Sequence, residues 1–234
     1  MLILALALNL FQAHAQVLAS PWNVLREEVL PAAGNPAHRQ LPVTLIVEAG
    51  SKWDNRTVLL QTLSKTSTIL GVCGISIGEA QVQTVVWQEG LMHRLENASP
   101  YNPPADLELV QGELPVTKPI AFLIGKGIYQ TAKAANRKYT DAYKRMFPQA
   151  DIEKLFGSII MTEQYISNTP VPYATATYNT FAHEMVHILA NTGHVMIRRN
   201  LMSEFEGRGM QTGDLTPEQC SAMASFGEPE ADAP

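Results

Sequence analysis

The feature that most limits how this chain can fold is the segment from His183 to His194, which holds three histidines and a glutamate. His183 and His187 are four residues apart, and side chains at i and i+4 lie one above the other on an α-helix. The segment therefore predicts a helix that presents both imidazoles to one ion. Glu184 projects beside that face, where its carboxylate can take a proton from a water at the metal.

A third ligand is needed, because a catalytic zinc site takes three protein ligands and keeps one position open. His194 supplies it if the helix ends and the chain turns back. Asn191 and Gly193 both tolerate the positive φ that such a turn uses. Thr180 is a suitable N-cap, and an apolar flank for the core consists of Phe181, Met185, Ile188 and Leu189. The alternative is an amphipathic core helix whose histidines only form hydrogen bonds.

This histidine segment, followed by Asn200-Leu201-Met202-Ser203, resembles the metzincin clan of zinc metallopeptidases, which combine a long H-E-x-x-H-x-x-G-x-x-H motif with a methionine turn. The resemblance implies a zinc-dependent endopeptidase that hydrolyses a peptide or protein substrate. In that clan three histidines bind one Zn²⁺, a glutamate is the general base and the methionine lies beneath the metal. In this sequence those roles fall to His183, His187, His194, Glu184 and Met202.

The implied fold is an α+β catalytic domain with a twisted mixed sheet, a backing helix, the active-site helix, the methionine turn and a C-terminal helix. In that architecture an edge strand binds an extended peptide through its backbone, and residues 82–87 or 158–166 are the candidates. An oxyanion formed during hydrolysis needs a hydrogen-bond donor. The sequence does not discriminate among Tyr165, Tyr173 and Tyr178 for this role.

Two departures from the motif keep alternatives open. Six residues separate His187 from His194 where the motif has five, and Ala190 stands at the position of its glycine. A thermolysin-like peptidase takes its third zinc ligand from a glutamate, and Glu204 or Glu206 lies at about that separation. A secreted zinc-containing binding module without turnover is a further alternative.

Both ends of the chain carry information about location and domain limits. An apolar stretch followed by Ala13-His14-Ala15 predicts a signal peptide over residues 1–15, too short to span a bilayer. We therefore expect a secreted or periplasmic protein without a membrane span. The catalytic domain is predicted over residues 16–226 and a flexible acidic tail over residues 227–234. A formal net charge of −5 argues against a nucleic-acid partner. The sequence does not indicate the oligomeric state.

Cys73 and Cys220 are the only cysteines. An even pair in an exported protein favours a disulfide, which would tie the middle of the chain to the C-terminal helix. Two buried free thiols are the alternative. A cysteine that caps the zinc is disfavoured, because Cys73 falls within a predicted core strand.

Hydrophobic periodicity predicts the remaining elements. Strands are expected at residues 42–48, 72–77, 82–87, 119–124 and 158–166, with a turn at Gly78-Glu79-Ala80 between the second and the third. Helical spacing predicts a short helix at residues 22–29 and a long one at 57–70 that ends at Gly71. Residues 128–156 are expected to form surface helix or loop. Thr216-Pro217-Glu218-Gln219 is a capping box that opens a helix reaching about Phe226.

Overall fold

One mixed sheet organises the part of the chain that the computed structural model describes, which is residues 22–88, 119–125, 132–137, 145, 156–166, 179–203 and 214–226. The strands are β1 (Trp22–Leu30), β2 (Arg39–Glu48), β3 (Ile75–Trp87), β4 (Ile120–Ile124), β5 (Ala132–Ala135) and β6 (Ser158–Thr162). Their order across the sheet is β1-β3-β2-β4-β6-β5. The four inner strands are parallel, whereas β1 and β5 run antiparallel at the two edges.

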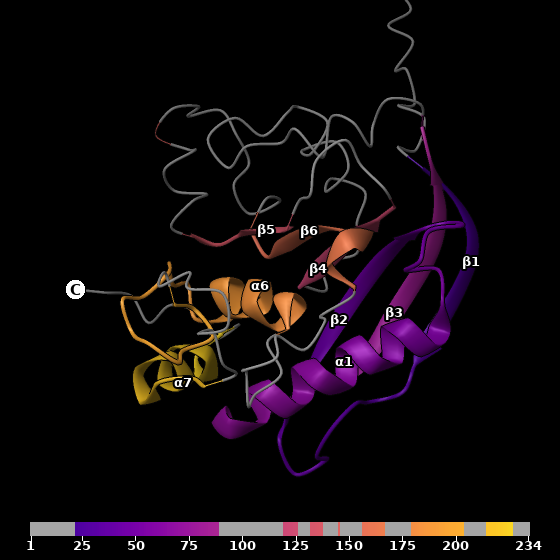
Figure 1. Cartoon of the computed structure of the whole chain (residues 1–234). Coiled ribbons are helices and arrows are strands. Elements are labelled where there is room, and N and C mark those ends of the chain that lie inside the picture. The colour runs from indigo at the N-terminus through magenta and orange to yellow at the C-terminus, as the bar shows by residue number, and fades with distance from the viewer. Residues whose placement is uncertain are drawn as a thin grey trace, which may run out of the picture.

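Three helices lie together on one side of this sheet (Figure 1). They are α1 (Arg56–Leu70), α6 (Thr180–Leu189) and α7 (Pro217–Ala224). The 3₁₀ turns η1 (Gly71–Cys73) and η2 (Glu163–Tyr165) follow α1 and β6. A mixed sheet with its described helices on one side agrees with the predicted α+β class. The predicted signal peptide and the C-terminal tail lie outside the described residues.

Both faces of the central strands are apolar and buried. Alternate side chains such as Leu45, Val82 and Leu123 join the core cluster under the helices. The intervening side chains point to the opposite face, where the Trp22 ring meets those of Trp87 and Phe122 edge-on. Burial on both sides explains why β4 is an uninterrupted apolar run and why the three central residues of β6 are apolar, as is typical of parallel strands.

The β3 strand is continuous, so the predicted turn at residues 78–80 is wrong. Leu41 pairs with Ile77 and Val43 pairs with Ala80, which leaves one extra residue in β3. This β-bulge shifts the alternation by one, so that Ile77 and Ala80 both face the helices. Gly78 lies within the bulge. The same sequence pattern is typical of a turn, which is why a turn was expected here.

Residues 22–29 form a strand and not the predicted short helix. β1 pairs antiparallel with β3 along its whole length, from Trp22 opposite Trp87 to Leu30 opposite Ala80. Its central residues 26–28 are charged, and Arg26 reaches Asp54 at 2.7 Å. Local spacing favours a helix here, but pairing with β3 satisfies the backbone instead.

Two further predictions about the sheet need correction. Residues 82–87 and 158–166 were expected as peptide-binding edge strands, yet β3 and β6 both lie inside the sheet. The edge nearest α6 is β5, which falls in a region predicted as surface helix or loop. The strands predicted at residues 42–48 and 119–124 are confirmed as β2 and β4.

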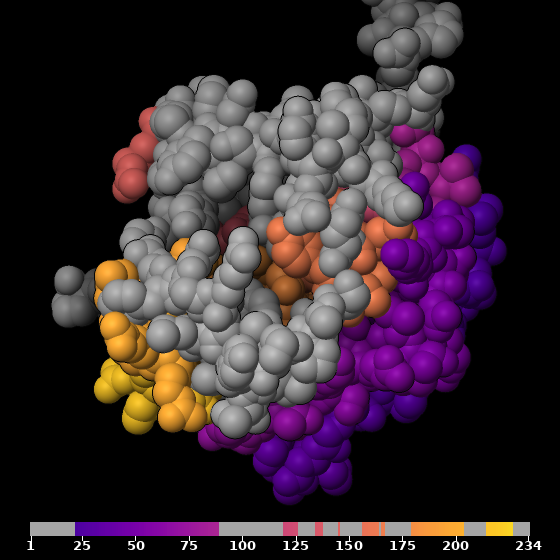
Figure 2. Space-filling model, in the orientation of Figure 1, coloured from indigo at the N-terminus to yellow at the C-terminus, as the bar shows by residue number. Residues whose placement is uncertain are grey.

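The long helix and the C-terminal helix agree with their predicted positions. Asn55 caps α1 by accepting from Thr57 and Val58, and α1 reaches Leu70. In α7 the capping box between Thr216 and Gln219 is present, with proline in the first turn. Figure 2 shows the side chains of the N-terminal elements, indigo to magenta, along one side of the molecule, with α7 in yellow at a lower corner.

A disulfide joins Cys73 to Cys220 and fastens α7 to the end of α1, as predicted. The two Cα atoms are 4.9 Å apart. Cys73 itself lies in η1 and not in the core strand that its flanking residues predict, because β3 begins only at Ile75.

Candidate metal centre

Helix α6 carries two of the histidines and is buried on all sides. Asn179 is its N-cap and accepts from Ala182 N at 3.1 Å, so the cap lies one residue before the predicted Thr180. The predicted apolar flank is confirmed, because four side chains join the core cluster: Phe181, Met185, Ile188 and Leu189. His183 and His187 are 5% and 6% exposed, so their helix holds them in nearly dry surroundings.

The chain reverses directly after α6, as the sequence predicts. The residues that make the reversal differ in part from those expected. α6 ends at Leu189 with Ala190 as its C-cap, and Asn191 takes the left-handed conformation with φ 47°. Gly193 does not have a positive φ, so one of the two expected positive-φ residues is sufficient. The reversal brings the exposed His194 back over the helix.

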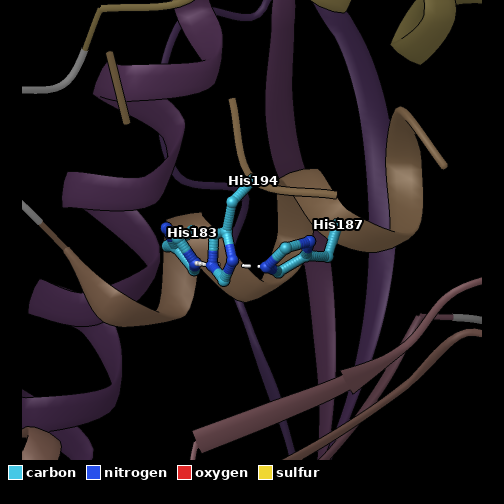
Figure 3. Close-up of side chains that lie close together, drawn as sticks. All are labelled: His183, His187 and His194. Carbon is cyan, nitrogen blue, oxygen red and sulfur yellow. Dashed lines mark hydrogen bonds between the residues drawn. The ribbon is translucent and has the colours of Figure 1, made fainter. Parts of the chain in front are cut away.

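The three imidazoles converge on one point (Figure 3). His183 Nε2 lies 3.1 Å from His187 Nε2 and 3.2 Å from His194 Nε2. One ligand atom from each of the three residues lies within 4.8 Å of the others, so the cluster can hold a metal ion. The insertion before His194 therefore does not prevent the three rings from meeting.

The tautomers of the two helical histidines follow from their partners. His183 Nδ1 lies 2.8 Å from Leu201 O and His187 Nδ1 lies 2.8 Å from Thr192 O. A carbonyl oxygen can only accept, so both Nδ1 atoms carry the proton and both Nε2 atoms present lone pairs. Two facing lone pairs 3.1 Å apart repel each other unless a cation or a proton lies between them.

Two of the three ligand separations agree with tetrahedral zinc coordination, and all three ligand atoms lie within 4.8 Å of one another. Nitrogens bound at about 2.0–2.1 Å in a tetrahedral site lie roughly 3.3 Å apart, close to the two Nε2 separations seen here. Ligating histidines also commonly donate their other N–H to a backbone carbonyl, as His183 and His187 do. Burial, followed by nearby imidazoles, lowers the pKa of His183 to about 4, and burial lowers that of His187 to about 4. Both rings are therefore neutral ligands at neutral pH.

Glu184 lies on the same helix and is 6% exposed. Burial raises its pKa to about 8, because the charged carboxylate loses its hydration. A divalent cation beside the carboxyl would act in the opposite direction and favour ionisation.

Tyr165 is the one candidate tyrosine among the described residues. Burial and then the charge of Glu184 raise the pKa of its phenol. Its ring packs against the core cluster from η2, directly after β6. Tyr173 and Tyr178 lie outside the described residues, as do the alternative ligands Glu204 and Glu206.

Residues 200–203, where the methionine turn is predicted, lie against the histidine cluster. Met202 is fully buried in the core cluster, and its carbonyl accepts from Val195 N at 2.7 Å. Asn200 Oδ1 accepts from Met202 N at 2.8 Å and so closes the turn. The turn contacts the chain beside His194 as well as the His183 ring.

Three amide side chains support the centre without having been predicted to do so. Asn136, at the end of β5, donates to Thr192 O at 3.1 Å, the carbonyl that also binds His187. Asn200 and Gln219 hydrogen-bond each other behind the methionine turn. The sequence marks Gln219 only as a member of a capping box. Nothing in the sequence around Asn136 indicates that it contacts the centre.

Comparison with known proteins adds no relative to this description. The chain matches no protein-family model, and no curated protein is similar to it in sequence. Among the described residues no helix combines the length and the apolar character needed to cross a membrane. The histidine cluster and its surroundings are therefore the basis for inferring a function.

Proposed function

We propose that this protein is an exported, zinc-dependent endopeptidase of the metzincin type. One observation carries the proposal: three imidazole Nε2 atoms converge beside a buried glutamate on the same helix. A closed structural zinc site would use a fourth protein ligand, and no further histidine, cysteine or acidic group joins this cluster among the described residues. This supports a catalytic site with one open position over a closed structural site.

The residues of the centre have distinct roles in the proposed reaction. Bound zinc would supply a Lewis acid that polarises the scissile carbonyl and makes a water acidic. His183, His187 and His194 would hold the ion. A carboxylate oxygen of Glu184 accepts the proton of the attacking water and passes it to the departing amide nitrogen. Burial favours the protonated form of Glu184 between those two transfers, which suits a group that must carry a proton.

The choice of His194 as third ligand supports a metzincin-type over a thermolysin-type site. His194 already lies 3.2 Å from His183 Nε2 although it comes from a different segment. The buried Met202 follows it in a turn tied to Val195, which agrees with a supporting methionine beneath the metal. Peptide binding along β5, which is an edge strand of the sheet that the described residues form, would place a substrate beside α6.

Export is part of the proposal and rests on two features. The first is the apolar N-terminal stretch with its A-x-A pattern. The second is the disulfide between Cys73 and Cys220, because such bonds persist in oxidising compartments.

Metal analysis and peptide cleavage by the wild type and Glu184→Gln test the function together. We expect one zinc per chain in both proteins, with cleavage of a peptide library slower by about 10²–10⁴-fold in the variant. Cleavage that is unchanged in Glu184→Gln would contradict the mechanism. Wild-type protein that holds zinc but cleaves no peptide would favour a binding module. Zinc retained in His194→Ala would favour a thermolysin-like site.

A further inference from the structure

We propose that the buried amide pair of Asn200 and Gln219 positions the metal ligands by holding the methionine turn in one conformation. The proposal rests on the metal-binding function proposed above. It assigns to Asn200 and Gln219 the role of positioning residues, which act on the metal through His183 and His194 and do not touch it.

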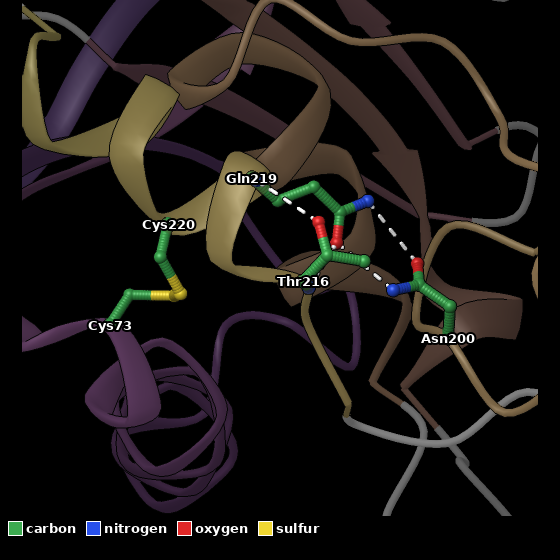
Figure 4. The surroundings of a disulfide bond; sticks show 5 residues. All are labelled: Cys73, Asn200, Thr216, Gln219 and Cys220. Atoms are coloured by element: carbon green, nitrogen blue, oxygen red, sulfur yellow. Dashed lines mark hydrogen bonds between the residues drawn. A yellow bond between two sulfur atoms is a disulfide. The ribbon is translucent and has the colours of Figure 1, made fainter.

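The two amides form a closed, reciprocal pair (Figure 4). Asn200 Nδ2 donates to Gln219 Oε1 at 3.0 Å, and Gln219 Nε2 donates to Asn200 Oδ1 at 3.2 Å. Each oxygen also accepts from a main-chain N–H, Asn200 Oδ1 from Met202 and Gln219 Oε1 from Thr216. Because a main-chain N–H can only donate, neither amide can flip without losing a hydrogen bond. The side chains are 2% and 6% exposed, so water cannot replace the lost partner.

The turn that the amide pair holds is hydrogen-bonded to one proposed ligand, His183, and to the segment that carries another, His194. Leu201 lies between Asn200 and Met202, and its carbonyl accepts the Nδ1 proton of His183 at 2.8 Å. The Met202 carbonyl accepts from Val195 N at 2.7 Å, one residue beyond His194. A displaced turn would leave the His183 Nδ1 proton without its acceptor in a buried site. It would also release the segment that carries His194.

The other end of the pair is fixed because α7 is itself fastened to the sheet frame. The disulfide ties Cys220 to Cys73 at the end of α1. At the C-terminal end of α7, the Arg39 guanidinium of β2 donates to the carbonyls of Ala224 and Phe226. Gln219 is thus presented to Asn200 from a helix that is held at its middle and at its C-terminal end. The amide pair connects this helix to the methionine turn, and Leu201 N adds a second connection by donating to Asp214 O at 2.8 Å.

Metal affinity distinguishes positioning from ordinary stabilisation. The test compares the oxidised full-length wild type with Asn200→Ala, Gln219→Ala and the double variant. Zinc affinity is measured by competition with a chelator, and site geometry by the visible absorption spectrum of bound Co²⁺. We expect each single variant to bind zinc about 10–100-fold more weakly, as for other residues that orient metal-bound histidines, with an altered Co²⁺ spectrum. The double variant should bind zinc no more weakly than the weaker-binding single variant does, because both substitutions disrupt the same pair of hydrogen bonds.

Two matched controls separate the pair from its surroundings. Ser67 is equally buried and accepts from Ile77 N at 2.9 Å, far along the chain from the centre. Ser67→Ala removes a buried hydrogen bond and should lower stability with unchanged zinc affinity. Thr216→Ala removes the other half of the α7 capping box while leaving the amide pair in place. Its zinc affinity should remain within about twofold of wild type, well short of the 10–100-fold loss expected when an orienting partner is removed.

Three results would overturn the proposal. The first is wild-type zinc affinity and Co²⁺ spectrum in folded Asn200→Ala and Gln219→Ala. The second is equal loss of zinc affinity in Thr216→Ala and Gln219→Ala. Should Asn200→Ala fail to fold, the same two measurements are made on Gln219→Met. This variant keeps the side-chain volume and decides in its place. The third is wild-type protein that binds neither zinc nor cobalt, which overturns the proposed function as well; metal binding by the wild type with unaffected variants overturns only the positioning role.

Discussion

The two halves of the candidate metal centre are held in different ways. His183 and His187 come from α6, whose residues are all buried and whose apolar side chains belong to the main core. His194 is exposed and comes from the loop after α6, where the apolar side chains of Met196 and Ile197 are exposed as well. Hydrogen bonds to main-chain atoms take the place of core packing in the loop. The helical half is therefore set by packing and the loop half by a small polar network.

This difference separates the stability of the fold from the precision of the site. Removal of a core contact should unfold both halves together, since a small domain unfolds cooperatively. Loss of a polar contact in the loop should instead change the place of His194 while α6 remains formed. Substitutions in each half and changes of pH should therefore have separable effects.

Removal of the disulfide should have the largest effect on stability. The bond joins residues 147 positions apart, and a loop of that length stabilises by up to about 5 kcal/mol through restriction of the unfolded chain. We expect the Cys73→Ser, Cys220→Ser double variant to lose up to this amount in chemical denaturation. Hydrogen exchange should then be faster in residues 190–203 than in α6. Equal acceleration in both segments would contradict the contrast between the halves.

The histidine ligands should differ in their effect on affinity. His187→Ala leaves one helical and one loop ligand, whereas His194→Ala leaves the rigid helical pair. We expect both to weaken zinc binding by more than about 100-fold, the upper range for residues that only orient a ligand. The loss should be greater for His187→Ala. Chelator competition measures it, and the reverse order would show that the loop half is the better ordered one.

Metal-free protein should be most stable near pH 6.5. Between about pH 4 and 6.5 the unfolded chain binds more protons at His183 and His187 than the folded chain does, so stability rises with pH. Between about pH 4.5 and 8 folded Glu184 keeps a proton that the unfolded chain has lost, so its contribution falls as pH rises. Up to about pH 6.5 the gain in stability from the two histidines exceeds the loss from the one glutamate. Above it stability should decline by about 1.4 kcal/mol per pH unit until pH 8.

Glu184→Gln is the matched control for that profile. Its side chain does not titrate, so the alkaline decline should disappear while the acidic limb remains. Urea denaturation of chelator-treated protein between pH 5 and 8.5 measures both limbs. A decline that persists in the variant would assign it to another group.

Substitutions in the reversal after α6 should have the smallest effect. Asn191 has φ 47°, so Asn191→Ala places an ordinary residue in the left-handed region and should cost about 1 kcal/mol. Gly193→Ala should change stability by less than about 0.5 kcal/mol, because φ is not positive there and no atom lies within 4 Å of an added Cβ. Thermal denaturation of both variants measures this, and a larger loss for Gly193→Ala would restore the role that its sequence context predicts.

Local patterns predicted those parts of the molecule whose reasons are local. The spacing of His183 and His187 is meaningful only on a helix, and the helix is there. The α7 capping box and the apolar strands β2 and β4 were likewise predictable from neighbouring residues. The prediction for residues 22–29 failed because their spacing suits a helix. They form a strand because they pair with β3, which is more than fifty residues away in the chain.

By itself the sequence determined the helical histidine pair, the glutamate beside it, the two cysteines that join and the α+β class, because each follows from short-range periodicity or composition. Only the tertiary structure decided that His194 reaches the pair despite the inserted residue, that Gly78 is part of a bulge, and that Asn136, Asn200 and Gln219 support the centre. These outcomes depend on hydrogen bonds between segments far apart in the chain. Such bonds form only after the core has brought the segments together.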